Sequence, residues 1–233
     1  MAAGALQYAI TGAYETLVEN FRTAADKAAC GYVKLAKPIP SCFKRERNGT
    51  VTFDGCLHLQ DWGKKPQVNI LVRAQETILP GGALPILKSS TVHVSYFKIE
   101  HDTAALLHSI HFDFGGEQDR HPLFHAQMCP ETIELSPNDA YALEFTFPQD
   151  FAKAICFKFA RIPTPDMTFS SVLLCLAADH MRTEFFREFM ESVRDVHEKM
   201  PLPAFENLKK SIAKEPGHLR SFHWFAHMEE PSP

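Results

Sequence analysis

Residues 91–114 read TVHVSYFKIEHDTAALLHSIHFDF, and this stretch predicts two β-strands joined by a turn. Residues 91–100 are rich in β-branched and aromatic side chains, which favour strands, and a second run suited to a strand follows over 104–114. His101-Asp102-Thr103 is the expected turn between them. Consecutive strands joined by so short a connection pair antiparallel. The centre of the chain therefore predicts an antiparallel sheet.

The sheet is expected to extend on both sides of this pair. Asn48-Gly49 predicts a hairpin within residues 42–59, because both residue types tolerate the positive φ angles of a tight turn. Further strands are expected at residues 68–73, 123–128, 141–147 and 154–159. We therefore expect a sheet of six to eight antiparallel strands.

Helical patterns stand at both ends of the chain. Apolar residues recur every three or four positions over 6–35, and Pro38 and Pro40 follow and end this pattern. A second pattern with the same spacing runs over 168–200. Asp166 or Thr168 can cap the second helix, and a shorter helix is expected over 204–214. Because strand and helix signals are grouped rather than alternating, the sequence predicts an α+β fold, with the sheet packed by an N-terminal helix and a long C-terminal helix. The expected organisation is a helix and β core over 1–165 and a helical segment and tail over 166–233, packed together as a single domain.

Composition narrows the class of protein. The 233 residues carry a formal net charge of −4, and no run of Lys or Arg exceeds two, which argues against nucleic acid as the main ligand. The first residues lack the pattern of a signal peptide, and no apolar stretch approaches the roughly 18 residues of a membrane span. Six cysteines are widely spaced, without a C-x-x-C pair. These features predict a reduced, cytoplasmic protein with free thiols and no membrane association.

Half of the 12 histidines fall within residues 93–125. Side chains alternate across a strand, so His111 and Asp113 share one face of the first strand, and His125 and Gln127 share one face of the next. If the two strands pair as a hairpin with matching faces, these four side chains converge, with His121 at the rim. A one-residue bulge would reverse which side chains meet.

Three interpretations of this cluster remain open. His111, Asp113, His121 and His125 could bind a divalent transition metal, the one cofactor that the sequence suggests. Alternatively, His111, Asp113 and His125 could perform metal-free acid–base catalysis or bind a ligand. The favoured interpretation is a polar sheet face on which histidine and aspartate satisfy each other, because no recognisable nucleophile or catalytic motif accompanies them. On the C-terminal helix, Asp179-His180 is a weaker candidate dyad, since His180 fits the apolar stripe.

The run from Tyr96 to Gln127, with an aromatic-flanked Asp113 followed by His121-Pro-Leu-Phe-His125, resembles a motif in uncharacterised bacterial proteins. Those proteins are often found near toxin–antitoxin or phage-defence genes, so the resemblance implies a bacterial or mobile-element setting and assigns no catalytic role. We expect a cytosolic interaction or sensing module with a protein partner. The alternative is a metal-dependent hydrolase or nuclease that uses the histidine cluster.

Overall fold

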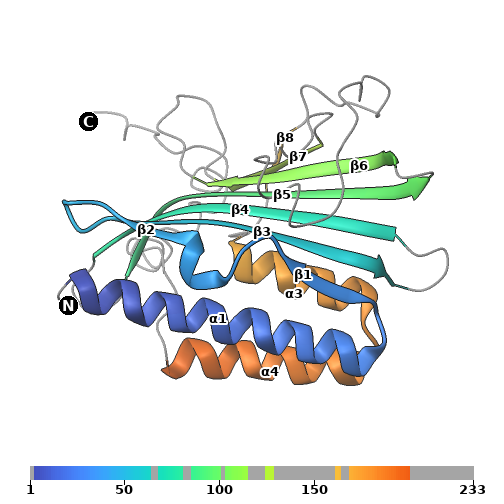
Figure 1. Ribbon diagram of the computed structural model, residues 1–233, viewed down its shortest axis with the longest axis horizontal. Helices are drawn as coiled ribbons and strands as arrows, with labels where there is room; N and C mark the ends of the chain where they lie inside the picture. Colours follow the sequence, from blue (N-terminus) through green and yellow to red (C-terminus); the bar gives the residue numbers. More distant parts are fainter. Residues whose placement is uncertain are drawn as a thin grey trace, which may run out of the picture.

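A computed structural model describes residues 3–63, 68–80, 85–100, 103–114, 124–128, 161–163 and 168–199. It has the predicted α+β architecture, with an antiparallel sheet covered on one face by helices (Figure 1). No helix in these ranges is long and apolar enough to cross a membrane. The expected strands at 141–147 and 154–159 and the expected helix at 204–214 lie outside the described residues.

The first helix, α1 (Ala3–Ala28), is amphipathic and ends earlier than the sequence pattern indicated. Ala29 and Gly31 adopt positive φ angles of 50° and 129°, which end the helix and turn the chain back. A Cβ atom on Gly31 would lie 2.3 Å from the carbonyl oxygen of Gln60, so only glycine fits there. The prediction of helix over residues 32–35 was wrong, because this segment forms strand β1 (Tyr32–Leu35) against the sheet edge.

Within the described residues the sheet contains eight strands, in agreement with the predicted six to eight, and its order is β1-β3-β4-β5-β6-β7-β8. The short β2 pairs with β3 beside β1, so both occupy one edge, and each pairing is antiparallel. Asn48-Gly49 forms the predicted turn, in which the Asn48 side chain accepts a hydrogen bond of 2.9 Å from the Thr50 amide. The remaining elements are the short 3-10 helix η1 (Ile39–Cys42), β2 (Phe43–Arg45), β3 (Val51–Trp62), β4 (Val68–Leu79), β5 (Ile86–Glu100), β6 (Thr103–Phe114), β7 (Phe124–Met128) and β8 (Arg161–Pro163).

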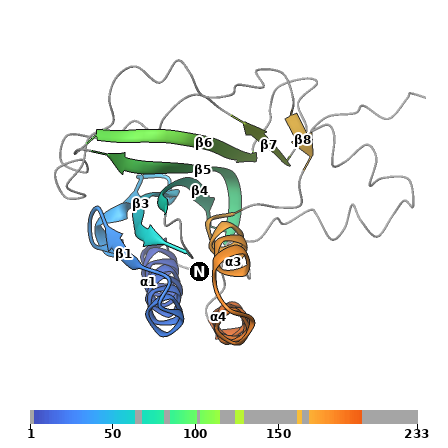
Figure 2. The ribbon, with the colours of Figure 1, turned by 90° about the vertical axis from the view of Figure 1, so that its right-hand side faces the viewer.

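The C-terminal helical pattern is divided into α3 (Phe169–His180) and α4 (Thr183–Lys199). The expected single helix is interrupted at Met181, whose extended backbone (φ −87°, ψ 157°) leaves the helical region while its side chain stays buried. Thr168 caps α3 as predicted, accepting a hydrogen bond from the Ser171 amide. The break lets α4 fold back beside α1 (Figure 2).

The hydrophobic core lies between the helices and one face of the sheet. Figure 2 shows α1 and α3 beneath the sheet, and α4 packs against both helices. Aromatic rings dominate this interface: Tyr14 contacts Phe53 at 4.8 Å and Phe21 contacts Trp62 at 5.5 Å between centroids. Burying each such ring contributes roughly 1.5–3 kcal/mol. The largest fully buried side chains of this core include Phe21, Phe53, Trp62, Phe169 and Phe189.

A buried carboxyl group links α1 and α3 to the sheet within this core. Glu76 of β4 is only 2% exposed and accepts hydrogen bonds from the Tyr14 hydroxyl of α1, the Ser90 hydroxyl of β5 (3.1 Å) and the Phe169 amide at the start of α3 (3.0 Å). Burial is the main cause that raises the pKa of the Glu76 carboxyl above its ordinary value. Burial, followed by the nearby Glu76 carboxyl, raises the pKa of Tyr14. The Tyr14 hydroxyl therefore keeps its proton and donates a hydrogen bond to Glu76.

Candidate functional site: a polar strip on the second sheet face

The sheet face that points away from the helices carries two adjacent rows of polar residues. Strand register fixes these rows, because each residue lies opposite its partner on the next strand. We call the two rows together the histidine strip. The first row runs Arg73, His93, His111 and Gln127, and the second runs Asp54, Gln75, Thr91 and Asp113. In the register, the backbone positions of Arg161 and His125 come next in these rows, and their side chains lie outside what the structure describes.

The pairing predicted between the two histidine-bearing strands is confirmed. In the β6–β7 ladder, Asp113 lies opposite His125 and His111 lies opposite Gln127. The register runs through all five pairs of this ladder without a shift, so this ladder has no bulge that would reverse which side chains meet. The side chain of His125 and the whole of His121 lie outside what the structure describes, so the complete predicted cluster is placed only in part.

Two members of the cluster contact each other directly. His111 and Asp113 project from the same face of β6, and the Nε2 atom of His111 lies 3.1 Å from Oδ2 of Asp113. The His111 ring also approaches His93 of β5, with 5.3 Å between ring centroids. Both members of the ion pair are partly exposed, His111 by 14% of its side-chain surface and Asp113 by 33%. The carboxylate thus orients an imidazole that is partly open to an incoming group.

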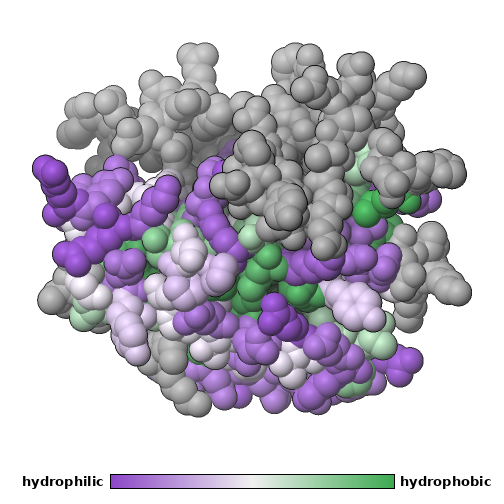
Figure 3. Space-filling view, in the orientation of Figure 1, coloured by the Kyte–Doolittle hydropathy of each residue, from purple (hydrophilic) through white to green (hydrophobic). Residues whose placement is uncertain are grey.

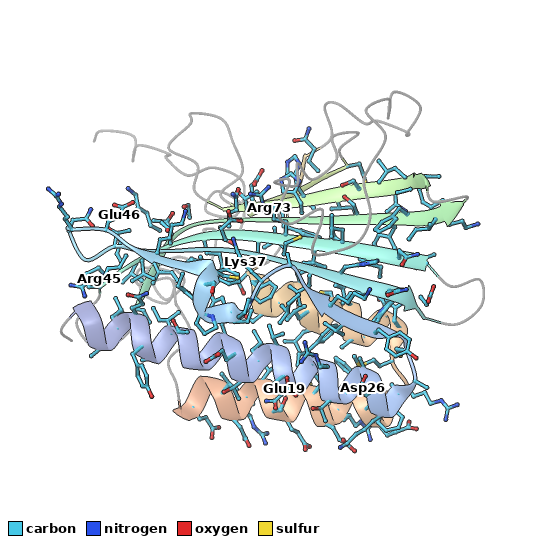
Figure 4. All side chains as sticks on the ribbon, in the orientation of Figure 1. Glu19, Asp26, Lys37, Arg45, Glu46 and Arg73 are labelled. Carbon is cyan, nitrogen blue, oxygen red and sulfur yellow. The ribbon has the colours of Figure 1, made fainter. Side chains whose placement is uncertain are left out.

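A second charged pair lies in the strip on the neighbouring strands. Arg73 of β4 donates from Nε and Nη2 to the two carboxylate oxygens of Asp54 on β3, each at 3.2 Å. This two-point geometry fixes the guanidinium plane more firmly than a single contact would. Figure 4 labels Arg73 on the side of the sheet away from α1 and α4. Sequence reasoning missed Arg73, Asp54 and His93 as site residues, although alternation within their strands would have placed each on a definite face.

The same sheet face becomes buried beyond the strip. A small apolar cluster forms there from Cys56, Leu71, Phe97 and Ala104. Beside it, His58 Nε2 contacts Asn69 Oδ1 at 3.0 Å, and burial lowers the pKa of the His58 imidazole. Because the Asn69 oxygen can only accept, His58 is neutral with its proton on Nε2. This end of the face is therefore structural, and it anchors the strands that carry the strip.

The Asp179-His180 candidate lies on the opposite, helix-covered side of the sheet. His180 is half-buried, and its Nε2 atom lies 3.5 Å from the Tyr96 hydroxyl, while the Tyr96 ring stacks on His108 at 4.3 Å. Burial raises the pKa of Tyr96 to about 12 and lowers the pKa of His108 and His180. These groups are neutral near pH 7 and pack together, which agrees with the interpretation of His180 as a packed helix residue.

The described side chains of the strip can form hydrogen bonds and ion pairs. Within the described ranges, no group of three or more His, Cys, Asp and Glu side chains has the arrangement of a metal site. From β3 to β7 the described side chains of the strip supply one guanidinium group, two separate carboxylates, two amides and two imidazoles. No protein-family model matches the chain, and the searches of curated proteins and of solved structures found no match.

Proposed function

We propose that this protein is a cytosolic interaction or sensing module, and that the histidine strip recognises a partner protein. The observation that supports the proposal is the continuity of the strip, which places half-buried and exposed polar side chains side by side from β3 to β7. Arginine, which the strip contributes through Arg73, is enriched at protein interfaces and among the residues that carry most of their binding energy.

The energetics of the charged pairs also favour recognition over a purely stabilising role. Arg73 and Asp54 remain 23% and 44% exposed, and ion pairs exposed to solvent typically contribute only about 0.2–1 kcal/mol to stability. When a partner covers such a pair, water is excluded and its hydrogen bonds strengthen. The same pair would then contribute orientation and specificity in a complex.

The bacterial setting, with a role in defence or in a toxin–antitoxin pair, is part of this proposal. It rests on the resemblance of residues 96–127 to proteins from such neighbourhoods. A partner encoded beside this gene is the first candidate for the strip, and co-purification of that gene product with this protein would reveal it.

Affinity capture from the native host tests the proposal. We expect one host protein to be recovered with the wild type and with a Glu191→Gln control on α4, and to be lost with an Arg73→Ala/His111→Ala variant. Glu191 is exposed and lies on the helical side of the molecule. Turnover of a substrate by the purified protein, abolished by His125→Ala, would instead show that the strip is an active site.

A metal-dependent hydrolase or nuclease is the second candidate. The contact between His111 and Asp113, with His125 opposite Asp113 in the register, favours it, because two imidazoles and one carboxylate form a recognised metal-ligand set. A metal bound there would activate water by lowering its pKa. This candidate predicts a stoichiometric metal that a His111→Ala/His125→Ala variant loses while remaining folded. Equal metal content in both proteins, measured by elemental mass spectrometry, would exclude it.

A further inference from the structure

A separate groove lies on the helical side of the molecule, between the middle of α1 and the segment that joins β1 to η1. Its volume is about 500 Å³, within the range of roughly 300–1,000 Å³ usual for ligand sites. Figure 3 shows hydrophobic side chains in the middle of this face with hydrophilic ones around them. The groove is remote from the histidine strip, which occupies the other face of the sheet.

The floor of the groove is apolar and firmly held. Val18 and Ile39 line it and are 2% and 4% exposed, and the half-buried Leu35 lies beside them. Pro38 and Pro40 form the exposed wall, where their rings restrict the backbone. The Pro38 carbonyl accepts a hydrogen bond of 2.9 Å from the Ser41 amide, which closes the turn. The groove is thus pre-formed, so a ligand would not have to order it.

The polar groups of the groove are mostly acceptors. Glu15 and Glu19 lie one helical turn apart on α1, both exposed, and Asn20 adds an amide. The Thr16 hydroxyl already donates to the Gly12 carbonyl at 2.8 Å. Glu19 shares one oxygen with Arg22 at 3.2 Å, whereas Glu15 has no hydrogen-bonding or ion-pairing partner among the described residues. A matching ligand must therefore bring donors and positive charge.

We propose that this groove binds a short peptide segment of a partner protein in which arginine or lysine stands next to an aliphatic residue. The cation meets Glu15 and Glu19, and the aliphatic side chain lies on the floor formed by Val18 and Ile39. Neighbouring carboxylates suit a guanidinium group, which offers several donors in a fixed plane. This inference does not depend on the histidine strip, since no strip residue lines the groove.

Fluorescence anisotropy of defined probes tests the inference on the full chain. The probe is a fluorescein-labelled hexapeptide of alternating arginine and leucine. One matched peptide replaces arginine by citrulline, which keeps the shape and removes the charge, and another replaces leucine by glycine. The test variant is Glu15→Gln/Glu19→Gln. The control is Glu191→Gln/Glu198→Gln on α4, which removes the same charge from exposed positions outside the groove.

We expect saturable binding of the arginine–leucine peptide by the wild type and by the control. The Glu15→Gln/Glu19→Gln variant should bind it about fivefold more weakly or worse, because each exposed ion pair contributes roughly a factor of two to five. Both matched peptides should bind more weakly than the arginine–leucine peptide, and added salt should weaken its binding. The inference is overturned if the wild type does not bind the probe, if the control loses as much affinity as the groove variant, or if either matched peptide binds as tightly.

Discussion

Removal of the Glu76 carboxyl group should destabilise the protein more than any surface change. In Glu76→Ala, the Tyr14 hydroxyl, the Ser90 hydroxyl and the Phe169 amide lose their acceptor inside the core. An orphaned buried donor costs about 1–3 kcal/mol. Part of this loss is offset, because the desolvated carboxyl group is itself removed. We therefore expect a net cost of about 3–5 kcal/mol, a large share of the roughly 5–15 kcal/mol typical of a folded domain.

Urea denaturation followed by circular dichroism measures this cost. The midpoint for Glu76→Ala should fall by about 1–2.5 M if the slope is near 2–3 kcal/mol per M. Glu76→Gln keeps an acceptor and nearly the same volume, so it should cost about 1 kcal/mol or less. Glu191→Ala, at an exposed position of α4, should change stability by at most about 0.5 kcal/mol. The reasoning fails if the alanine change at Glu76 costs as little as this control, or if the glutamine change costs as much as the alanine change.

The pH dependence follows from the same carboxyl group. The pKa of Glu76 in the folded state is raised above the ordinary value of 4.5, so folding favours its protonated form. Its contribution is complete below pH 4.5 and is lost as the pH rises through the folded pKa. The wild type should therefore lose stability relative to Glu76→Gln over this rise, as measured by urea midpoints at successive pH values. A stability difference that stays constant with pH would contradict the pKa shift.

Further substitutions test other parts of the fold. Gly31→Ala should cost about 2–4 kcal/mol of stability, because the φ of Gly31 is 129° and the new Cβ would lie 2.3 Å from a backbone oxygen. In the control Gly4→Ala, the atom nearest to the new Cβ lies at 3.4 Å, so stability should change by at most about 0.5 kcal/mol. Thermal melts of both variants measure the difference. The folded-state pKa of His58 is lowered from 6.5, so the wild type should lose stability as the pH falls below 6.5 towards that pKa. His58→Gln, which retains a donor for Asn69, should show a shallower loss in melts at successive pH values, and identical slopes would contradict the assignment.

The sequence was most informative where one periodic pattern was continuous. Alternation in residues 104–114 and 123–128 predicted the face shared by His111, Asp113, His125 and Gln127, and the register agrees. Periodicity was less informative at element ends. The pattern of α1 continued to Leu35, although the positive φ angles at Ala29 and Gly31 end the helix before β1. The break at Met181 contains neither proline nor glycine, and its buried apolar side chain fits the helical pattern.

The remainder of the candidate site could not be predicted because it depends on contacts between distant segments. Arg73 and Asp54 join the strip only through the pairing of β3 with β4 and of β4 with β5.

The buried carboxyl group in the core could not be predicted either. Glu76 occupies a position of β4 whose neighbours Ala74 and Ile78 are apolar and buried, so a lone carboxyl group there is unexpected from the sequence pattern alone. Its acceptor role emerges only when α1 and α3 meet over the sheet.

Site-specific photo-crosslinking in host cells tests the central claim, that the histidine strip is a binding surface, most directly. A photoreactive phenylalanine analogue would replace Gln75, an exposed member of the strip, or Glu191 on α4 as the matched exposed position. We predict a discrete protein adduct from position 75 that is absent from position 191 and that disappears when His111→Ala is added. Equal adducts from both positions, or an adduct at position 75 that persists unchanged in the His111→Ala background, would contradict the claim.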